Sequence, residues 1–260
     1  MDTLRDWNPA HYLEYRNERT QPSIDLVNRI KINYNPSGII DIGCGPGNSS
    51  EVLFRRWPAA KFTGLDSSEN MIEKAKHDYP GKVWVLADAL TFSPEDKFDI
   101  LFSNATIQWI PRHEELITRF HQWLTERGML AIQLPLFWTM PVGKSLRAIA
   151  QQSRWKPLIG KALDLVTIHD PRFYYDLLSR LFRNTELWVT DYMHVFDSHL
   201  SILNMIRSAA LKPYFDLLTY GNDSSDFETL ILEEIKKAYP LQEDRKVLFP
   251  FKRLFFTAYK

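Results

Sequence analysis

A short stretch, Gly38–Ser50, constrains the fold of this chain more than any other part of the sequence. It reads GIIDIGCGPGNSS: an apolar run, three alternating glycines and a polar Asn-Ser-Ser that opens a helical pattern. A buried strand, a glycine turn and a helix N-terminus in this order form a nucleotide cradle, because the backbone N–H groups of the turn point at the ligand. The stretch therefore predicts an α/β protein with a nucleotide-binding loop.

Strand and helix patterns alternate from this stretch onward, which limits the fold class. Such an alternation predicts a mainly parallel sheet with helices on both faces. Two later runs, Glu186–Phe196 and Lys252–Tyr259, are expected to complete a seven-stranded, mostly parallel sheet with one antiparallel edge strand. The five earlier strands are predicted at Ile39–Gly43, Lys61–Asp66, Lys82–Ala87, Phe98–Ser103 and Met129–Leu134.

The 260 residues are expected to form a single domain, residues 1–260, built from four segments. Residues 1–37 are predicted to form an N-terminal helix and lid, and residues 38–134 the nucleotide-binding half. Prolines at positions 135, 141, 157 and 171 interrupt the alternation, so residues 135–183 are predicted to be an inserted helical cap. Residues 184–260 are expected to complete the sheet and the site of the second substrate.

Composition excludes several classes of function. Lys+Arg and Asp+Glu both number 32, so the chain lacks the basic excess of a nucleic-acid-binding protein. Cys44 is the one cysteine, which excludes an internal disulfide and a multi-cysteine metal site, and no metal is expected. No apolar run has the length of a signal peptide core or a membrane span. We therefore expect a cytoplasmic monomer with no nucleic-acid or membrane partner.

The spacing of the glycines and of three polar residues at strand ends narrows the choice of nucleotide. The dinucleotide fingerprint requires its third glycine where this chain has Asn48, which counts against a dinucleotide-dependent oxidoreductase. Asp66, about 20 residues beyond the glycines, can accept both hydroxyls of a ribose. Asp88 and Asn104 end the third and fourth predicted strands. A single Asp at a strand end caps a helix or forms a turn more often than it binds a ligand. The evidence for a nucleotide site is therefore the combination of the glycines with all three polar residues.

At this point the sequence resembles the class I S-adenosylmethionine-dependent methyltransferases, which have a Rossmann-like fold. The glycine motif alone is shared by that whole superfamily. The likeness runs nearly end to end, and its more particular parts resemble the trans-aconitate 2-methyltransferase family. Those parts are the opening DWNP and ERTQP, the segments TGLDSSENMIEKA and SNATIQWIP, and the closing YPLQEDRKVLFPFKRLFF.

The resemblance implies S-adenosyl-L-methionine as cofactor, S-adenosyl-L-homocysteine as product, and a role for each matching residue. Residues of the glycine loop would hold the methionine part, Asp66 the ribose, and residues beside it the adenosine. The strand end at Asp88 would bind the adenine edge, and the one at Asn104 would border the sulfonium. The implied cofactor-binding residues are Asp41, Gly43, Gly45, Gly47, Asp66, Ser67, Met71, Asp88, Ala89, Asn104 and Ala105.

The resemblance also implies a small carboxylic acid as methyl acceptor. A carboxylate is ionised at neutral pH, since its pKa is about 4, so no general base is required. Gln108 and Trp109 would position donor and acceptor, and arginines would bind further carboxylates of the substrate. The candidate substrate-binding residues are Arg19, Gln108, Trp109, His169, Tyr174, Tyr192, Arg207 and Arg253. Each charged candidate could instead lie on a solvated face.

One departure from the family pattern concerns the acceptor. Where the family reads Met-Pro-Asp-Asn and then Glu-Pro-Thr-His, this chain has Leu134-Pro135-Leu136-Phe137 and Met140–Lys144. Two apolar residues in place of an acid and an amide favour a less polar acid than trans-aconitate. The alternatives are a malonyl-carrier carboxylate, a phenol or an amine as acceptor, or a non-catalytic module that binds S-adenosylmethionine.

Overall fold

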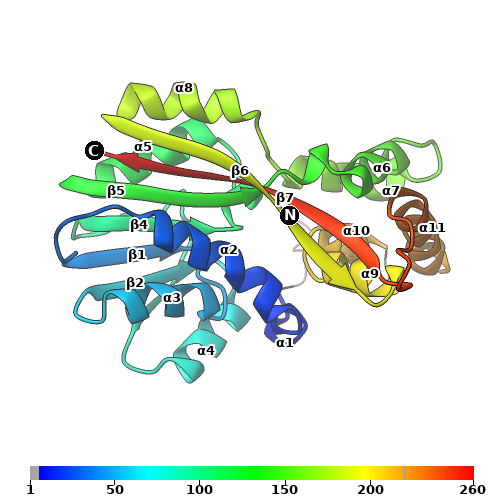
Figure 1. Ribbon diagram of the computed structural model, residues 1–260, viewed down its shortest axis with the longest axis horizontal. Helices are drawn as coiled ribbons and strands as arrows, with labels where there is room; N and C mark the ends of the chain where they lie inside the picture. The colour runs from blue at the N-terminus through cyan, green and yellow to red at the C-terminus, as the bar shows by residue number, and fades with distance from the viewer. Residues whose placement is uncertain (1–5, 219–220) are drawn as a thin grey trace. The chain divides into compact units, whose positions relative to one another are not determined.

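The computed structural model describes residues 6–218 and 221–260, so residues 1–5 of the predicted lid lie outside it. It contains a seven-stranded sheet with the strand order β3-β2-β1-β4-β5-β7-β6 (Figure 1). Strands β1 to β5 pair in parallel, while β7 pairs antiparallel with β5 and β6. The predicted fold class is confirmed, and the antiparallel strand β7 lies one position inside the edge strand β6.

Burial along the strands explains their sequences. Every residue of β4 is buried, which suits the near-continuous apolar run FDILFSN of a strand covered on both faces. The edge strand β6 instead alternates between exposed and partly buried residues. The strands are β1 (Gly38–Ile42), β2 (Lys61–Asp66), β3 (Val83–Leu86), β4 (Phe98–Asn104), β5 (Leu124–Pro135), β6 (Asn184–Phe196) and β7 (Val247–Tyr259).

The chain forms two compact units, which we describe separately. The first, called the sheet unit here, comprises Asp6–Leu134, His169–Val189 and Leu254–Lys260. The apolar spacing of Ile24, Val27 and Ile30 predicts a helix over Ser23–Asn33, but helix α2 begins at Arg16 and contains Pro22. The helices of this unit are α1 (Pro9–Leu13), α2 (Arg16–Arg29), α3 (Asn48–Arg56), α4 (Glu69–Asp78), η1 (Ile107–Trp109), α5 (His113–Trp123) and α8 (Pro171–Leu181).

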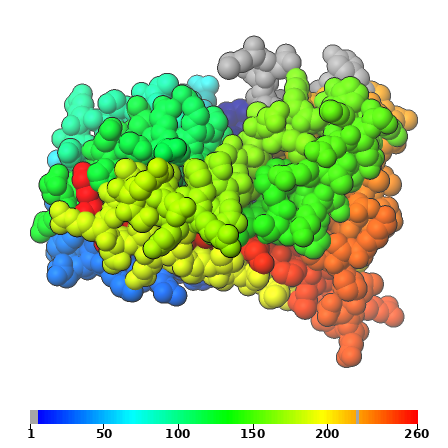
Figure 2. All heavy atoms as spheres, turned by 90° about the horizontal axis from the view of Figure 1, so that it is seen from above, coloured from blue at the N-terminus to red at the C-terminus, as the bar shows by residue number. Residues whose placement is uncertain are grey.

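Helices α5 and α8 of the sheet unit pack against each other although 47 residues of sequence, 124–170, separate them. Helix α8 begins with Pro171 at its first position, and the Asp170 side chain accepts a hydrogen bond from the Arg172 N–H at 2.9 Å. In the space-filling view, the yellow-green atoms of α8 occupy surface close to those of α5 (Figure 2). The contact brings the buried Tyr174 of α8 to His113, the first residue of α5.

The second unit, called the helical unit here, comprises Pro135–Ile168 and Thr190–Arg253 among the described residues. Helix α11 packs against α6 and α9 and buries Phe227, Ile231 and Ile235. The segments predicted as cap and C-terminal part are thus divided between both units. The helices of this unit are η2 (Phe137–Thr139), α6 (Pro141–Ala150), α7 (Lys156–Ile159), η3 (Gly160–Leu165), α9 (His199–Arg207), α10 (Lys212–Leu217) and α11 (Asp223–Ala238).

The described residues contain neither a membrane-spanning helix nor a cluster of metal ligands. Among the helices of residues 6–218 and 221–260, none combines the length and the apolar character needed to cross a bilayer. Within the same residues, no three His, Cys, Asp or Glu side chains are grouped as ligands for a metal ion.

Candidate functional site

The glycine loop after β1 forms one wall of a pocket in the sheet unit. Gly43 donates from its N–H to the Leu65 carbonyl at 2.7 Å, which ties the loop to the end of β2. Its φ of +69° lies in the left-handed region, and a Cβ there would lie 2.1 Å from the Thr106 side chain. A Cβ on Gly45 would meet nothing within 4 Å, so this turn of the loop faces open space. The loop is therefore tightly fixed at its start and accessible at its centre.

Asp66 connects the glycine loop to helix α4. One carboxylate oxygen accepts the Gly45 N–H at 2.8 Å, and the other accepts the Ser68 N–H at 2.9 Å. Burial raises the pKa of Asp66, while the N–H groups of Ser68 and Gly45 oppose that rise. The Ser67 N–H opposes the rise as well, and a carboxylate has about four lone-pair directions, so Asp66 keeps capacity for a ligand. The geometry suits an acceptor for a pair of hydroxyl groups.

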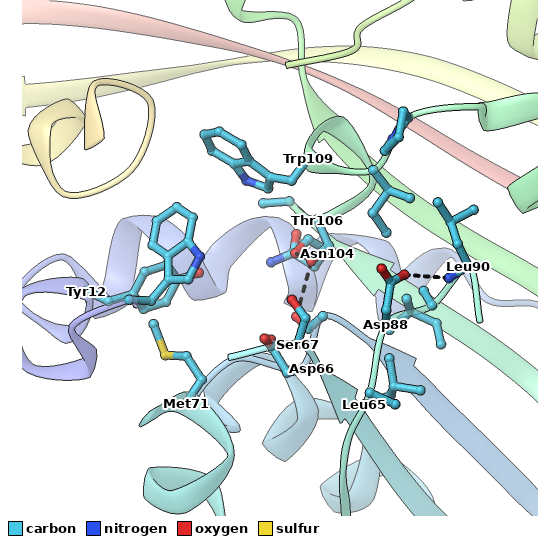
Figure 3. A pocket seen from close by; sticks show the side chains of 18 residues that line it. Tyr12, Leu65, Asp66, Ser67, Met71, Asp88, Leu90, Asn104, Thr106 and Trp109 are labelled. Atoms are coloured by element: carbon cyan, nitrogen blue, oxygen red, sulfur yellow. Dashed lines mark hydrogen bonds between the residues drawn. The ribbon is translucent and has the colours of Figure 1, made fainter. Parts of the chain in front are cut away.

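The pocket beside this loop has an empty volume of about 880 Å³. Figure 3 shows Asp66 and Ser67 on one side, Asp88 and Leu90 on another, Met71 and Tyr12 on a third, and Trp109 on the side opposite Met71. The described residues that line it include two carboxylates and no Lys, Arg or His side chain. Its lining is Trp7, Tyr12, Ile42, Gly43, Leu65, Asp66, Ser67, Met71, Ala87, Asp88, Ala89, Leu90, Asn104, Ala105, Thr106, Trp109, Ile110 and Pro111.

Most of the predicted cofactor-binding residues line this pocket. Asp41, Gly45 and Gly47 do not line it but lie in the strand and loop that form its wall. Asp88 also stabilises a turn, as an Asp at a strand end often does, because its Oδ1 accepts a hydrogen bond from the Leu90 N–H at 2.7 Å (Figure 3). The roles of these residues in binding remain predictions.

Asn104 presents an unused acceptor at the end of β4. Its side chain is buried, and its Nδ2 donates to Ser49 Oγ at 3.1 Å and to the Arg19 carbonyl at 3.4 Å. Its Oδ1 has no hydrogen-bond partner, which is costly for a buried oxygen unless a ligand supplies a donor or a positive charge. Together with Asp66 and Asp88, this oxygen makes the described lining suited to a cationic, hydroxyl-bearing ligand.

The loop after Asn104 carries the predicted positioning residues. Trp109 lines the pocket, while Gln108 is buried and donates from Nε2 to the Ala105 carbonyl at 2.7 Å. Gln108 Oε1 has no hydrogen-bond partner. Ala105 has a φ of +54°, a strained value for a residue other than glycine. The structure thus places Trp109, but not Gln108, at the pocket surface.

Sequence reasoning missed the aromatic contribution of the N-terminal segment. Trp7 contacts Trp109 edge to face with ring centroids 5.4 Å apart, and both line the pocket. Asp6 accepts hydrogen bonds from Ser68 Oγ at 2.5 Å and from the Asn70 N–H at 3.0 Å, at the start of α4. The aromatic content of DWNP was visible in the sequence, but nothing in it located these rings over the pocket.

The predicted substrate-binding residues fall into three groups. In the sheet unit, the Arg19 guanidinium lies 4.0 Å from the ring centroid of Tyr12, which itself lines the pocket. His169 and Tyr174 lie together around His113 and do not line the pocket. The helical unit contains the third group, Tyr192, Arg207 and Arg253.

The two arginines of the helical unit differ in their surroundings. Arg253 is buried in β7, with its guanidinium 4.4 Å from the ring centroid of Phe251 and 5.9 Å from that of Tyr192. Arg207 is partly exposed, forms an ion pair with Glu228 and lies over the ring of Phe215. A buried guanidinium between aromatic rings is the rarer arrangement.

Comparison with known proteins decides the family. Residues 40–132 match the family described as "Methyltransferase domain". The trans-aconitate 2-methyltransferase of Escherichia coli O17:K52:H18 (strain UMN026) is 36% identical over 255 residues, 98% of this chain and 98% of that protein. The one from Escherichia coli O157:H7 (strain EC4115) is 37% identical over the same shares. The chain belongs to the trans-aconitate 2-methyltransferase family. The predicted family and enzyme class are confirmed.

Solved structures support the fold of this methyltransferase. Phosphoethanolamine N-methyltransferase 2 of Haemonchus contortus, solved with S-adenosyl-L-methionine, matches 97% of this chain and 56% of its own, with a TM-score of 0.61 and 16% identity. The YcgJ protein of Bacillus subtilis matches 92% of this chain and 98% of its own, with a TM-score of 0.59 and 15% identity. At these identities the likeness concerns the fold alone.

Proposed function

We propose that this methyltransferase transfers the methyl group of S-adenosyl-L-methionine to a carboxylate of trans-aconitate or a closely related small acid. One observation carries the proposal: in a chain that matches the trans-aconitate enzymes end to end, one pocket is lined by Asp66, Asp88 and Asn104, whose buried Oδ1 has no partner. The product of the cofactor would be S-adenosyl-L-homocysteine.

The pocket residues fit the parts of S-adenosyl-L-methionine in an ordered way. Asp66 would accept the ribose hydroxyls, and the strand end at Asp88 and Ala89 would bind the adenine edge. Asn104 Oδ1, a buried oxygen without a partner, suits the positively charged end of the cofactor. When bound, the cofactor supplies an electrophilic methyl group on a sulfonium, and the two carboxylates of the lining favour that charge.

The reaction makes modest chemical demands on the chain. An acceptor carboxylate is already ionised at neutral pH, with a pKa of about 4, so no proton has to be removed. The described lining holds no His, Lys or Cys that could act as a base. Trp109 and Gln108 would instead align donor and acceptor, and positioning of this kind lowers a barrier by about 7–11 kcal/mol.

Binding of the acceptor's other carboxylates requires cationic groups. Arg253 is our first choice, because a buried guanidinium flanked by Phe251 and Tyr192 is held in one orientation for bidentate binding. Arg207 shares its charge with Glu228 and is the weaker choice. Arg19, Gln108, Trp109, His169 and Tyr192 complete the proposed acceptor set, whereas Tyr174, predicted with them, is fully buried with its hydroxyl bonded to His113 and is not proposed to touch the acceptor.

The apolar stretch after β5 favours an acceptor less polar than trans-aconitate as the second candidate. Leu136 and Phe137 are buried, where the family pattern has an acid and an amide. These positions lie at the start of the helical unit, which also holds Arg253. A monocarboxylic acid with a hydrocarbon tail would tolerate this change better than a tricarboxylate.

A panel assay with methyl-labelled S-adenosyl-L-methionine tests the function. Trans-aconitate, other di- and tricarboxylates, fatty acids, a malonyl carrier, a phenol and an amine are offered in parallel, and methyl esters are identified by base-labile label. Label on trans-aconitate is the expected result. Label only on the phenol or amine would refute the carboxylate acceptor, and saturable cofactor binding without any transfer would favour a binding module.

The working form of the enzyme is proposed to be a cytoplasmic monomer that needs no nucleic acid. The balance of 32 basic and 32 acidic residues supports the absence of a nucleic-acid partner. Light scattering coupled to size exclusion should give the mass of one chain, 30.6 kDa. A mass of two chains would overturn this part of the proposal.

A further inference from the structure

The first residue of α5, His113, lies beneath the loop that carries Trp109. Its side chain is 1% exposed, although histidine is usually found closer to the surface. Its Nε2 lies 2.8 Å from the carbonyl oxygen of Ile107, the first residue of η1. Its Nδ1 lies 2.8 Å from the hydroxyl of Tyr174, which helix α8 presents. His113 thus connects a pocket loop to a helix 61 residues away.

These contacts determine where the protons are. A carbonyl oxygen only accepts, so Nε2 carries the hydrogen and donates it to Ile107. Burial lowers the pKa of His113, and the nearby His169 adds to this effect, so the ring is neutral at pH 7. Nδ1 of the neutral ring is then an acceptor, and the Tyr174 hydroxyl donates to it. The Tyr174 oxygen accepts in turn from the His169 N–H, at 3.4 Å.

The loop between β4 and α5 needs such a restraint. It is bounded by two residues with left-handed backbone angles, Ala105 with a φ of +54° and Arg112 with a φ of +60°. Conformations of this kind cost about 1–3 kcal/mol each in residues other than glycine and persist only where surrounding contacts fix them. The bond to Ile107 fixes η1 from inside, two residues before Trp109.

The groups around His113 are fixed as well. Tyr174 is fully buried and its ring stacks on Phe256, with centroids 5.4 Å apart. His169 contacts His113 edge to face at 5.1 Å and stacks on Phe173 at 4.0 Å. Two charged residues of these helices, Glu114 and Arg180, pair with each other on the exposed side, 3.2 Å apart.

We propose that His113 and Tyr174 are positioning residues of the methyltransferase: their hydrogen bonds hold η1, and with it the Trp109 wall of the cofactor pocket. Tyr174 then acts through His113, not by contact with the acceptor. The inference rests on the proposed function only for its activity readout. The position of Trp109 and the binding of cofactor can be measured without any acceptor.

Two pairs of variants test this role. Tyr174→Phe removes the hydroxyl but keeps the ring on Phe256, and Tyr175→Phe on the exposed face of α8 is its control. His113→Phe removes the bond to Ile107, while His113→Gln keeps an N–H donor near the position of Nε2 and should restore it. If His113→Phe does not fold, the Tyr174→Phe pair still decides the question.

Three measurements report on the tautomer of His113, on the surroundings of Trp109 and on the affinity for the cofactor. Long-range ¹H–¹⁵N spectra should show one histidine as a fixed Nε2–H tautomer, assigned by its absence in His113→Gln, and Tyr174→Phe should destroy that fixed state. With 5-fluorotryptophan, the ¹⁹F signal of Trp109, assigned by Trp109→Phe, should shift or broaden in Tyr174→Phe. The Kd for S-adenosyl-L-methionine should rise roughly three- to tenfold, the loss expected for one buried hydrogen bond.

Each outcome decides for or against the proposal. Tyr174→Phe and His113→Phe with unchanged cofactor Kd and an unchanged Trp109 signal would overturn it. A Tyr174→Phe variant that raises only the acceptor KM would also overturn it, because Tyr174 would then contact the acceptor. Restoration of the Kd by His113→Gln supports it, since mere loss of stability would not respond to a donor at Nε2. Failure of the proposed function would appear separately, as absence of methyl transfer in the wild type.

Discussion

The buried carboxylate of Asp41 should make the cofactor-free enzyme less stable as the pH rises. Asp41 is fully buried in the centre of β1, and its Oδ2 accepts from Ser50 Oγ at 2.6 Å while its Oδ1 has no partner. Burial raises the pKa of Asp41 to about 7, with Ser50 opposing the rise and Asp66 adding to it. The same carboxyl in an unfolded chain has a pKa of about 3.9.

The size and sign of the effect follow from these two pKa values. Below about pH 4 both states hold the proton, so the carboxyl contributes no pH-dependent cost. Between about pH 4 and 7 the unfolded chain releases its proton and the folded protein keeps it, so stability falls by about 1.4 kcal/mol per pH unit. Above pH 7 both states are ionised and the loss levels off at about 4 kcal/mol.

Asp41→Asn removes this dependence, since the amide cannot ionise and its oxygen can still accept from Ser50. Urea unfolding of the cofactor-free protein at pH 5, 6, 7 and 8 should show the variant gaining on the wild type by about 3 kcal/mol between pH 5 and pH 8. If Asp41 supports the glycine loop, Asp41→Asn should bind the cofactor more weakly than the wild type although it is more stable. Such a trade of stability against function is common.

Asp99→Asn is a matched control. Asp99 is also buried, but both its oxygens accept hydrogen bonds, from the Ser37 N–H at 2.6 Å and from Thr125 Oγ1 at 2.8 Å. An amide there turns one donor toward another donor, so the variant should be less stable than the wild type, by about 1–3 kcal/mol. A stability difference between Asp41→Asn and wild type that stays constant from pH 5 to 8 would refute the reasoning.

Three further predictions concern the pocket and the acceptor. Asp66→Ala should weaken cofactor binding by about 2 kcal/mol or more, because the N–H groups of the loop and the ribose hydroxyls lose their acceptor. The Kd measured by calorimetry should rise roughly thirtyfold. An unchanged Kd would mean that the nucleotide lies elsewhere. Gly43→Ala should lower the free energy of unfolding by about 2 kcal/mol, since its Cβ would lie 2.1 Å from Thr106 in a left-handed backbone, and Thr106→Ala should relieve part of that loss. Arg253→Ala should raise the KM for the acceptor at least tenfold and leave the Kd for the cofactor unchanged. Arg253→Lys should restore only part of the acceptor affinity, because lysine cannot bind a carboxylate bidentately. An unaltered KM would show that Arg253 is not part of the acceptor site.

The site residues that could be predicted from the sequence are those whose position follows from the alternation of strands and helices along the chain. Asp66, Asp88 and Asn104 each end a predicted strand, and parallel strands bring their carboxyl ends to one edge of the sheet. The structure brings all three to one pocket. The local sequence pattern was sufficient to predict these three residues, because a parallel sheet brings the ends of its strands together.

Contacts made by tertiary packing were beyond that reasoning. Nothing near His113 in the sequence indicates that its Nδ1 meets a tyrosine 61 residues later. The apolar spacing of Ile24, Val27 and Ile30 also predicted that this helix starts at Ser23, yet α2 begins at Arg16. Burial of Arg19 against Tyr12 stabilises that earlier turn and overrides the local signal.

The attachment of the N-terminal segment to α4 has a kinetic consequence. Trp7 and Tyr12 are part of the pocket wall, and Asp6 holds them there through Ser68 and Asn70. We therefore expect these contacts to lengthen the residence time of S-adenosyl-L-homocysteine in the pocket, because a product that leaves on this side must first break them.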